Sequence, residues 1–308
     1  MTDSKVLSNN SLPIELFTID PEYEKETMRK IVHENADLIF LAGISKNQSS
    51  DETGYKLMTS IPKIFPIRKG SVYMNLSLVY PTLNSLKDKK LIRSEEINDK
   101  RQKKLLSVLP EGEDYLLGSF VSLCRLMNFY DMRYAKPTLK ARARVLQSWL
   151  RRKYARNLAF NDKEAYDDFK QDELMKKHVS RNIEFLILTS LSEGKRHGYK
   201  IGKEAEKIFK SEIGSSSLYP ALIKMEKSGL IKFEGWENSD DKPKKIYSIT
   251  PMGERYRDSY MISLERLGNY IAGTCVDMLM DRKLKKDGID MKALKEMEVN
   301  PLTAIRMH

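Results

Sequence analysis

The chain has 308 residues, of which 41% are hydrophobic and 31% are charged, a composition that excludes a collagen-like, disulfide-scaffold or wholly disordered protein. Two cysteines, Cys124 and Cys275, are too few for a disulfide framework or a four-thiolate metal site. The longest apolar run, residues 38–44, is far shorter than the roughly 20 residues that cross a bilayer. We expect a protein of the reducing cytosol, with no signal peptide, no membrane span, no metal and no cofactor.

The formal net charge of +11 is concentrated in one segment. Residues 132–161 contain no Asp or Glu, and from Thr138 to Phe160 the apolar residues recur at three and four, which predicts a long amphipathic helix. The cations of this segment are Arg133, Lys136, Lys140, Arg142, Arg144, Arg151, Arg152, Lys153 and Arg156. The pattern is typical of a surface that contacts phosphates, of a solvated structural helix between domains, or of a helix on a membrane surface.

An internal repeat organises the rest of the chain. Three blocks recur in the same order: residues 54–56 match 198–200, residues 78–92 match 217–231 at an offset of 139, and residues 103–112 match 244–253 at an offset of 141. Unrelated helices would rarely reproduce three blocks in order. We predict a tandem duplication of a domain of about 75 to 85 residues.

The second copy reads, in chain order, as three helices followed by a hairpin. Helices are predicted over residues 183–191, over 199–209 and from the serine run 215–217 to Gly229, and strands over 230–236 and 244–249. The serines are expected to cap the third helix, with Pro220 in its first turn, and residues 238–243 form a polar turn. This is the order of a winged helix-turn-helix.

The second copy resembles the PadR family of winged-helix transcriptional regulators. The resemblance rests on residues 186–191, 197–199, 214–222, 227–231 and 245–250, with Gly253 closing the last block. The first copy is a degenerate version, because the residue directly before Gly54 is not a histidine and Leu106 stands in the place of Tyr247. The repeat and the resemblance together imply a mainly α fold with small β-hairpins (α+β), in which a helical linker joins two winged helix-turn-helix domains.

The predicted organisation has six segments. They are an N-terminal tail (1–30), a degenerate first winged-helix domain (31–115), a helical linker with the basic helix (116–180), a second PadR-like domain (181–257), a C-terminal packing or dimerisation helix (258–285) and a C-terminal tail (286–308). The apolar stripe of residues 258–281 is expected to pack on residues 115–130. That contact would make an intramolecular pseudo-dimer, and the alternative is a homodimer.

The candidate DNA-binding residues have hydroxyl, aromatic or cationic side chains. In the second copy they are His197, Tyr199, Lys200, Ser215, Ser216, Ser217, Tyr219, Lys224, Lys242, Lys244 and Lys245; in the first, Tyr80, Lys100, Arg101, Lys103 and Lys104; in the linker, Arg144, Arg151, Arg152 and Arg156. Hydroxyls and amides at a helix start suit a phosphate, and lysines at a hairpin tip suit the DNA backbone or minor groove. The alternatives are that Tyr80 and Tyr219 belong to the core, that His197 caps a helix, and that the lysines are simply solvated.

We therefore expect a sequence-specific, double-stranded DNA-binding transcriptional regulator, a repressor by resemblance, located in the cytoplasm at the nucleoid, with an unidentified effector. The alternatives are a nucleoid-structuring protein of low sequence specificity and a protein-interaction adaptor built on winged helices. No phosphate loop or zinc-protease motif is present in the sequence, and its histidines are not clustered, so we expect no enzyme.

Overall fold

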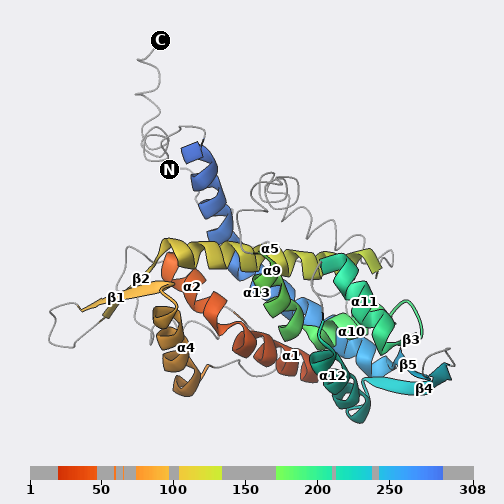
Figure 1. Ribbon diagram of the computed structural model, residues 1–308. Coiled ribbons are helices and arrows are strands. Elements are labelled where there is room, and N and C mark those ends of the chain that lie inside the picture. Colours follow the sequence, from red (N-terminus) through yellow and green to blue (C-terminus); the bar gives the residue numbers. More distant parts are fainter. Residues whose placement is uncertain are drawn as a thin grey trace, which may run out of the picture.

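A computed structural model describes residues 20–46, 59, 65, 74–96, 104–133, 171–209, 213–237 and 243–286. Most of these residues are helical, and their strands form two small antiparallel sheets (Figure 1). The predicted fold class, mainly α with small β-hairpins, is confirmed. We call residues 20–133 the first half of the molecule and residues 171–286 the second half.

The described elements of the two halves follow the same order. The first half contains α1 (Pro21–Glu34), α2 (Ala36–Lys46), α4 (Leu76–Asp88), β1 (Ile92–Glu96), β2 (Lys104–Val108) and α5 (Pro110–Arg133). The second half contains α9 (Gln171–Arg181), α10 (Ile183–Leu191), β3 (Arg196–His197), α11 (Gly198–Phe209), α12 (Ser215–Lys227), β4 (Ile231–Glu237), β5 (Lys244–Ile249) and α13 (Pro251–Lys286). A counterpart of β3 and α11 would fall between α2 and α4, where most residues lie outside the described part.

The second half has the architecture of a winged helix. Its three strands lie in the order β3-β5-β4, and Tyr247 of β5 is opposite Arg196 on one side and Phe233 on the other. Helices α10, α11 and α12 pack together and against this sheet. The buried apolar side chains here include Phe185, Leu186, Leu188, Leu191, Ile201, Ala205, Leu218, Leu222, Met225 and Leu230. The core therefore fixes how α12 and the hairpin are presented to solvent.

The turns after α4 and α12 share a backbone conformation. After α12 the amide of Leu230 donates to the carbonyl of Met225 at 3.0 Å, and the corresponding bond after α4 is 2.9 Å long. Such a turn needs a residue in the left-handed region, which is Gly229 (φ 74°) after α12 and Lys90 (φ 55°) after α4. In the first half, a lysine thus adopts a backbone conformation that favours glycine.

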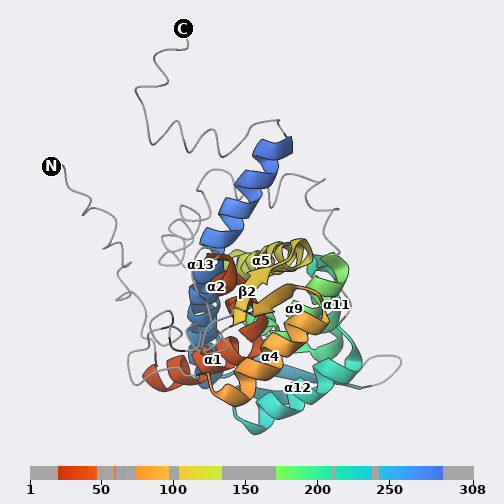
Figure 2. The ribbon, with the colours of Figure 1, turned by 90° about the vertical axis from the view of Figure 1, so that its left-hand side faces the viewer.

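The two halves are joined by an exchange of helices. Helix α1 of the first half packs along α13, α9 of the second half packs along α5, and α5 packs against α13 (Figures 1 and 2). The hydroxyls of Thr27 and Ser263 lie 3.0 Å apart between α1 and α13. A Cβ at Gly268 of α13 would lie 3.2 Å from Cε of Met127 in α5, so these two helices approach closely. Each half therefore covers its first helix with the last helix of the other.

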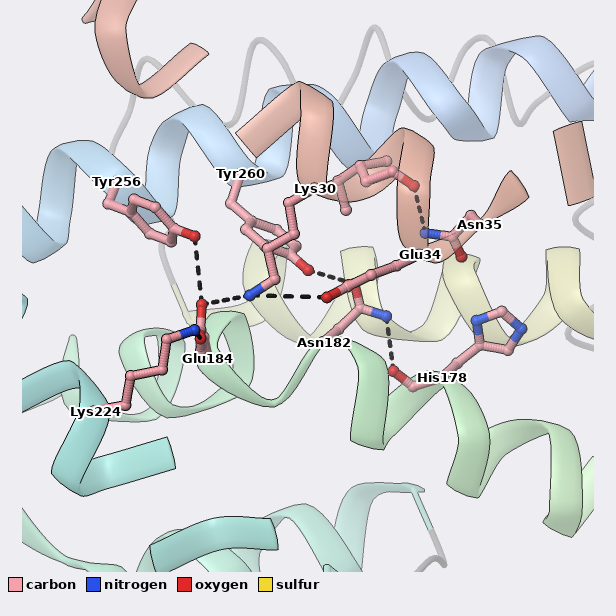
Figure 3. Close-up of polar contacts among 10 residues, drawn as sticks. Lys30, Glu34, Asn35, His178, Asn182, Glu184, Lys224, Tyr256 and Tyr260 are labelled. Atoms are coloured by element: carbon pink, nitrogen blue, oxygen red, sulfur yellow. Dashed lines mark hydrogen bonds and ion pairs between the residues drawn. The ribbon is translucent and has the colours of Figure 1, made fainter. Parts of the chain in front are cut away.

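A carboxylate in the second half is neutralised by a lysine from the first. Glu184 of α10 accepts hydrogen bonds from Lys30 of α1 at 2.5 Å and from Lys224 of α12 at 2.8 Å (Figure 3). The hydroxyl of Tyr256 in α13 donates to the same carboxylate at 3.3 Å. Burial raises the pKa of Glu184, but the hydrogen bonds of the two lysines outweigh burial and lower it overall. Glu184 is therefore a carboxylate with two cationic partners.

The matching carboxylate of the first half, Asp37 of α2, has the same kinds of partner. Its Oδ2 accepts hydrogen bonds from Lys177 of α9 at 2.9 Å and from Tyr115 of α5 at 2.5 Å, and Arg181 adds bonds of 3.0 and 3.2 Å. Burial raises the pKa of Asp37, but the charges of Arg181 and Lys177 outweigh burial and hold it well below its ordinary value. The two clusters are related by a constant offset in the sequence. Asp37 and Glu184 are 147 positions apart, and so are Lys30 and Lys177.

A cavity of about 340 Å³ lies beside Asp37 and distinguishes the two halves. Its wall includes Ser85 of α4, the position that corresponds to Lys224 of α12 at the offset of 139. In the second half the Lys224 ammonium occupies the corresponding place against Glu184. Ser85 is too short to reach Asp37 in the same way.

Candidate nucleic-acid interface

Helix α12 begins earlier than the sequence suggested. Ser215, Ser216 and Ser217 form its first turn and Gly214 is the N-cap residue, so the prediction that a serine caps this helix is wrong. The Gly214 carbonyl accepts the Ser217 amide at 2.9 Å, and no side chain caps the helix. Pro220 consequently lies inside the helix instead of in its first turn. The uncapped start leaves a positive dipole end and exposed hydroxyls, a combination that suits a phosphate.

The outer face of α12 is aromatic and aliphatic. Tyr219 is 48% exposed and Ile223 is 49% exposed, whereas Leu222 and Met225 are fully buried. Tyr219 therefore points away from the core. The Lys224 side chain is also exposed, but its ammonium is bonded to Glu184, so this predicted DNA contact already has a partner within the protein.

The start of α11 lies close to α12. The Lys200 amide donates to Nδ1 of His197 at 3.1 Å, so His197 caps α11, as the alternative reading of this residue expected. The His197 ring stacks on Tyr199, which is 55% exposed, and Nζ of Lys244 lies 5.5 Å from the Tyr199 ring. Burial lowers the pKa of His197 against the opposing charge of Glu237, which favours the neutral ring that the cap requires.

The hairpin β4–β5 carries cations and exposed aromatic rings. Lys244 and Lys245 begin β5, and Lys242 lies outside the described residues. Trp236 is 57% exposed and Phe233 is 38% exposed on β4. Neither ring is among the residues predicted to contact DNA, although large aromatic residues in a strand before a polar turn are a signal for such a contact.

The first half offers a different surface at the corresponding place. Tyr80 of α4 is 56% exposed and Leu76 is 51% exposed. The Asn75 side chain caps α4 by accepting the Leu78 amide at 3.1 Å, and the first turn holds no charged residue. Of the predicted cations, Lys100, Arg101 and Lys103 lie outside the described residues, and Lys104 is placed only by its backbone, as the first residue of β2.

Helices α4 and α12 lie on the same side of the molecule. Both are at the lower side in Figures 1 and 2, opposite α5, and the two hairpins lie toward opposite ends in Figure 1. One long ligand could therefore contact both helices. The linker cations Arg144, Arg151, Arg152 and Arg156 fall outside the described residues.

Two searches within the described residues concern other classes of site. No three His, Cys, Asp or Glu side chains there are grouped in a way that could hold a metal ion. None of the described helices is both long and apolar enough to cross a bilayer.

Three comparisons with known proteins were made. No curated protein matches the chain significantly. The solved structure of a transcriptional regulator from Clostridium thermocellum, Cth-833, is 23% identical, covers 37% of this chain and 98% of that chain, and superposes with a TM-score of 0.24. Residues 187–259 match the model of the Transcriptional regulator PadR-like family, a match that runs from α10 to the start of α13 and supports a transcriptional regulator.

Proposed function

We propose that this protein is a sequence-specific regulator of transcription that binds double-stranded DNA and represses. The family match of residues 187–259 carries the proposal, because it covers α12 and the hairpin β4–β5. These elements carry large exposed side chains, such as Tyr219 and Trp236. In a helix-turn-helix the corresponding helix enters the major groove, and a basic hairpin follows the backbone or the minor groove. In this proposal the protein acts by binding DNA and catalyses no reaction on it.

The residues of the second half divide into three roles. Ser215, Ser216 and Ser217 hold a phosphate at the start of α12, and Tyr219 lies along the groove. Lys200, Lys242, Lys244 and Lys245 neutralise backbone charge. His197 positions Tyr199 and the start of α11 through its cap, and Lys224 stabilises the packing of α12 through Glu184.

The first half provides a weaker second contact in this proposal. Its contacts are Tyr80 on α4 and the hairpin cations Lys100, Arg101, Lys103 and Lys104. We further propose that the two halves descend from a tandem duplication and form an intramolecular pseudo-dimer, which the shared element order and the exchanged helices support. A single chain would then span a site with two unequal parts.

Charge reversal tests the ranking of the two hairpins. Changing Lys242, Lys244 and Lys245 to Glu should weaken binding to a selected genomic fragment by about tenfold or more, because backbone contacts are lost. The same change at the four first-half cations should have less than about a third of that effect. Equal losses from the two variants would contradict the ranking, and no binding by the parent protein would contradict the function.

Competition distinguishes a regulator from a nucleoid-structuring protein. A regulator retains its selected site against excess random duplex, whereas a structuring protein does not.

The linker cations Arg144, Arg151, Arg152 and Arg156 contribute affinity without specificity in our proposal. Their change to Gln should weaken specific and random binding alike and flatten the salt dependence, since each neutralised phosphate contributes about 0.9 to the slope.

A further inference from the structure

We infer that Trp236 is a wedge that enters the minor groove of duplex DNA and partly unstacks one base step, so that binding kinks the duplex. The inference rests on the DNA-binding function proposed above and assigns a mode of contact to the hairpin. Trp236 is 57% exposed at the outer end of β4. An exposed indole on a cationic hairpin has apolar surface to bury, and inserted apolar side chains kink DNA toward the major groove.

A bulge in β4 brings Trp236 to the face on which Phe233 lies. Residues three apart in a regular strand point to opposite faces. The register of β4 shifts between Phe233 and Gly235, and Gly235 has a φ of 132°, which a residue with a side chain rarely adopts. The rings of Phe233 and Trp236 consequently meet edge to face with centroids 5.7 Å apart. The bulge thus places the Phe233 and Trp236 rings side by side on one face of β4, whereas regular pairing would place them on opposite faces.

This aromatic surface continues toward α12. Phe233 is the cross-strand partner of Tyr247, and their ring centroids are 6.5 Å apart. Burial raises the pKa of Tyr247, as do Glu226 and Tyr219 of α12, which lie near its hydroxyl. Helix α12 also packs against β4. The hairpin that carries the wedge therefore packs directly on α12, through β4 and the buried Tyr247, so both can contact one duplex.

The charges around the rings favour a polyanion as the partner. Nζ of Lys245 lies 5.5 Å from the Phe233 ring and 5.7 Å from the Trp236 ring, and Lys245 is also the cross-strand partner of Trp236. Lys244 is next to it in β5. Ammonium groups beside an exposed ring can neutralise the phosphates that flank an opened base step.

Glu234, one of the two acidic residues of β4, has its partners on the other face of the strand. Glu234 accepts hydrogen bonds from Lys195 at 2.9 Å and from Ser248 at 2.6 Å, and Lys232 lies 2.8 Å from its carboxylate. Glu237 lies 3.7 Å from Nε2 of His197. Ser248 pairs with Lys232, so the Glu234 cluster is on the face opposite Phe233 and Tyr247. The bonded carboxylate of β4 therefore does not share the aromatic face with Lys245.

The first half has no such wedge in its described hairpin residues. Ser94 of β1 corresponds to Phe233, and the pairing of β1 with β2 is regular from Ile92 to Glu96. Exposed Glu95 of β1 is paired with Arg93, so these two residues add no net positive charge to this hairpin. The kink should therefore be located on one side of the bound site only.

Trp236 can report on its own contact in the full-length protein. The chain has two tryptophans, so Trp149→Phe leaves Trp236 as the single indole. The probe is the 30-base-pair duplex that the parent protein selects from a random pool, with a fluorophore on each end. We expect the indole emission to be quenched on binding and the end-to-end energy transfer to rise as the duplex bends.

Substitutions separate the wedge from the charge of the hairpin. Trp236→Ala should remove the bend and weaken binding by about five- to hundredfold, the range found for a lost base-stacking contact, and Trp236→Phe should restore most of both. Lys232→Ala, a change on the opposite face of β4, should leave the bend unchanged. If the Ala variant does not fold, the quenching of the Trp236 emission and the bend measured with the Trp149→Phe protein decide the case.

Three outcomes would overturn the inference. They are unchanged indole emission on binding, quenching without a bend, and a Trp236→Ala variant that binds and bends the duplex as the parent does. In each of them the parent still binds DNA, so the proposed function stands. If the parent selects no duplex at all, the proposed function fails together with the wedge.

Discussion

Nζ of Lys30 lies 2.5 Å from Oε2 of Glu184, although 154 positions separate the two residues in the chain. The matching pair, Lys177 and Asp37, is 140 positions apart and 2.9 Å long. In both cases the lysine comes from the first helix of one half and the carboxylate from the second helix of the other. Each half therefore supplies the counter-charge for a carboxylate of its neighbour.

Removing the charge of Asp37 should destabilise the whole molecule. In Asp37→Asn, the cations Lys177 and Arg181 keep their partly buried positions without a carboxylate. We expect the free energy of unfolding in urea to fall by about 3 kcal/mol. Glu95→Gln, which breaks an ion pair with Arg93 whose side chains are about 60% exposed, is the control and should cost less than about 1 kcal/mol. Similar losses would mean that Asp37 has no special structural role.

His178 should make stability depend on pH. Burial lowers its pKa to about 3, as do the nearby charges of Arg181 and Lys177, from an ordinary value of 6.5. The unfolded chain therefore binds a proton that the folded chain does not, and stability falls as pH drops from 6.5 towards 3, by up to about 1.4 kcal/mol per pH unit. Asp37 does not contribute above its ordinary value of 3.8.

The variant His178→Ile tests this dependence, because Ile31 of α1 has the corresponding position in the first half. Neither ring nitrogen of His178 has a hydrogen-bond partner in the described structure, so little is lost by the change. Thermal unfolding between pH 4.5 and 7 should show a flatter profile for His178→Ile than for the parent. His33→Gln, at an exposed position, should keep the parent's profile. A profile unchanged in His178→Ile would assign the pH dependence to another group.

Replacing Lys90 by glycine should stabilise the protein. The lysine adopts a φ of 55°, which costs about 1 kcal/mol or more relative to glycine. We expect urea unfolding to show a gain of roughly that size in Lys90→Gly. Lys89→Gly is the control; its φ of −80° is ordinary, so glycine there should destabilise by about 0.5–1 kcal/mol.

The opposite change tests the correspondence between the two turns. Gly229→Lys would have to adopt a φ of 74°, and its Cβ would lie 2.8 Å from Cε of Met252. We expect a loss of more than about 1 kcal/mol. A neutral effect would show that the turn after α12 can change its conformation.

The second half alone should form a homodimer. In a fragment of residues 171–286, α9 has lost α5, but α13 of a second copy can take its place if the halves are equivalent. Light scattering should give twice the fragment mass, and Leu267→Asp, at a fully buried position of α13, should abolish the dimer. A folded monomeric fragment would contradict the equivalence of α5 and α13.

Local patterns predicted most of the second half. The helix predicted over residues 183–191 and the strand over 244–249 have the observed bounds. The last helix was expected only from Asp258, yet Pro251 is its first residue, where proline is favoured. Gly253 is needed for packing, since a Cβ there would lie 2.0 Å from the Leu230 carbonyl oxygen. A contact of that kind is not visible in a sequence window.

The candidate interface was harder to predict than the fold. Lys224 was selected as a free cation, because its partner Glu184 is 40 positions earlier and only folding brings them together. Trp236 was not predicted as a contact. Regular strand periodicity would place Trp236 and Phe233 on opposite faces of β4, and only the bulge at Gly235 brings them to the same face. The roles of the hydroxyls and lysines in DNA binding stay predictions.

The exchange of helices also has a consequence for biosynthesis. Thr27 and Ser263, which meet in the contact of α1 with α13, are 236 positions apart, a distance that a ribosome translating about 5–20 residues per second covers in roughly 10–50 s. During that interval the apolar side of α1, with Met28, Ile31 and Val32, has emerged without its native cover. A nascent chain of this protein therefore exposes the apolar side of α1 until α13 has been translated.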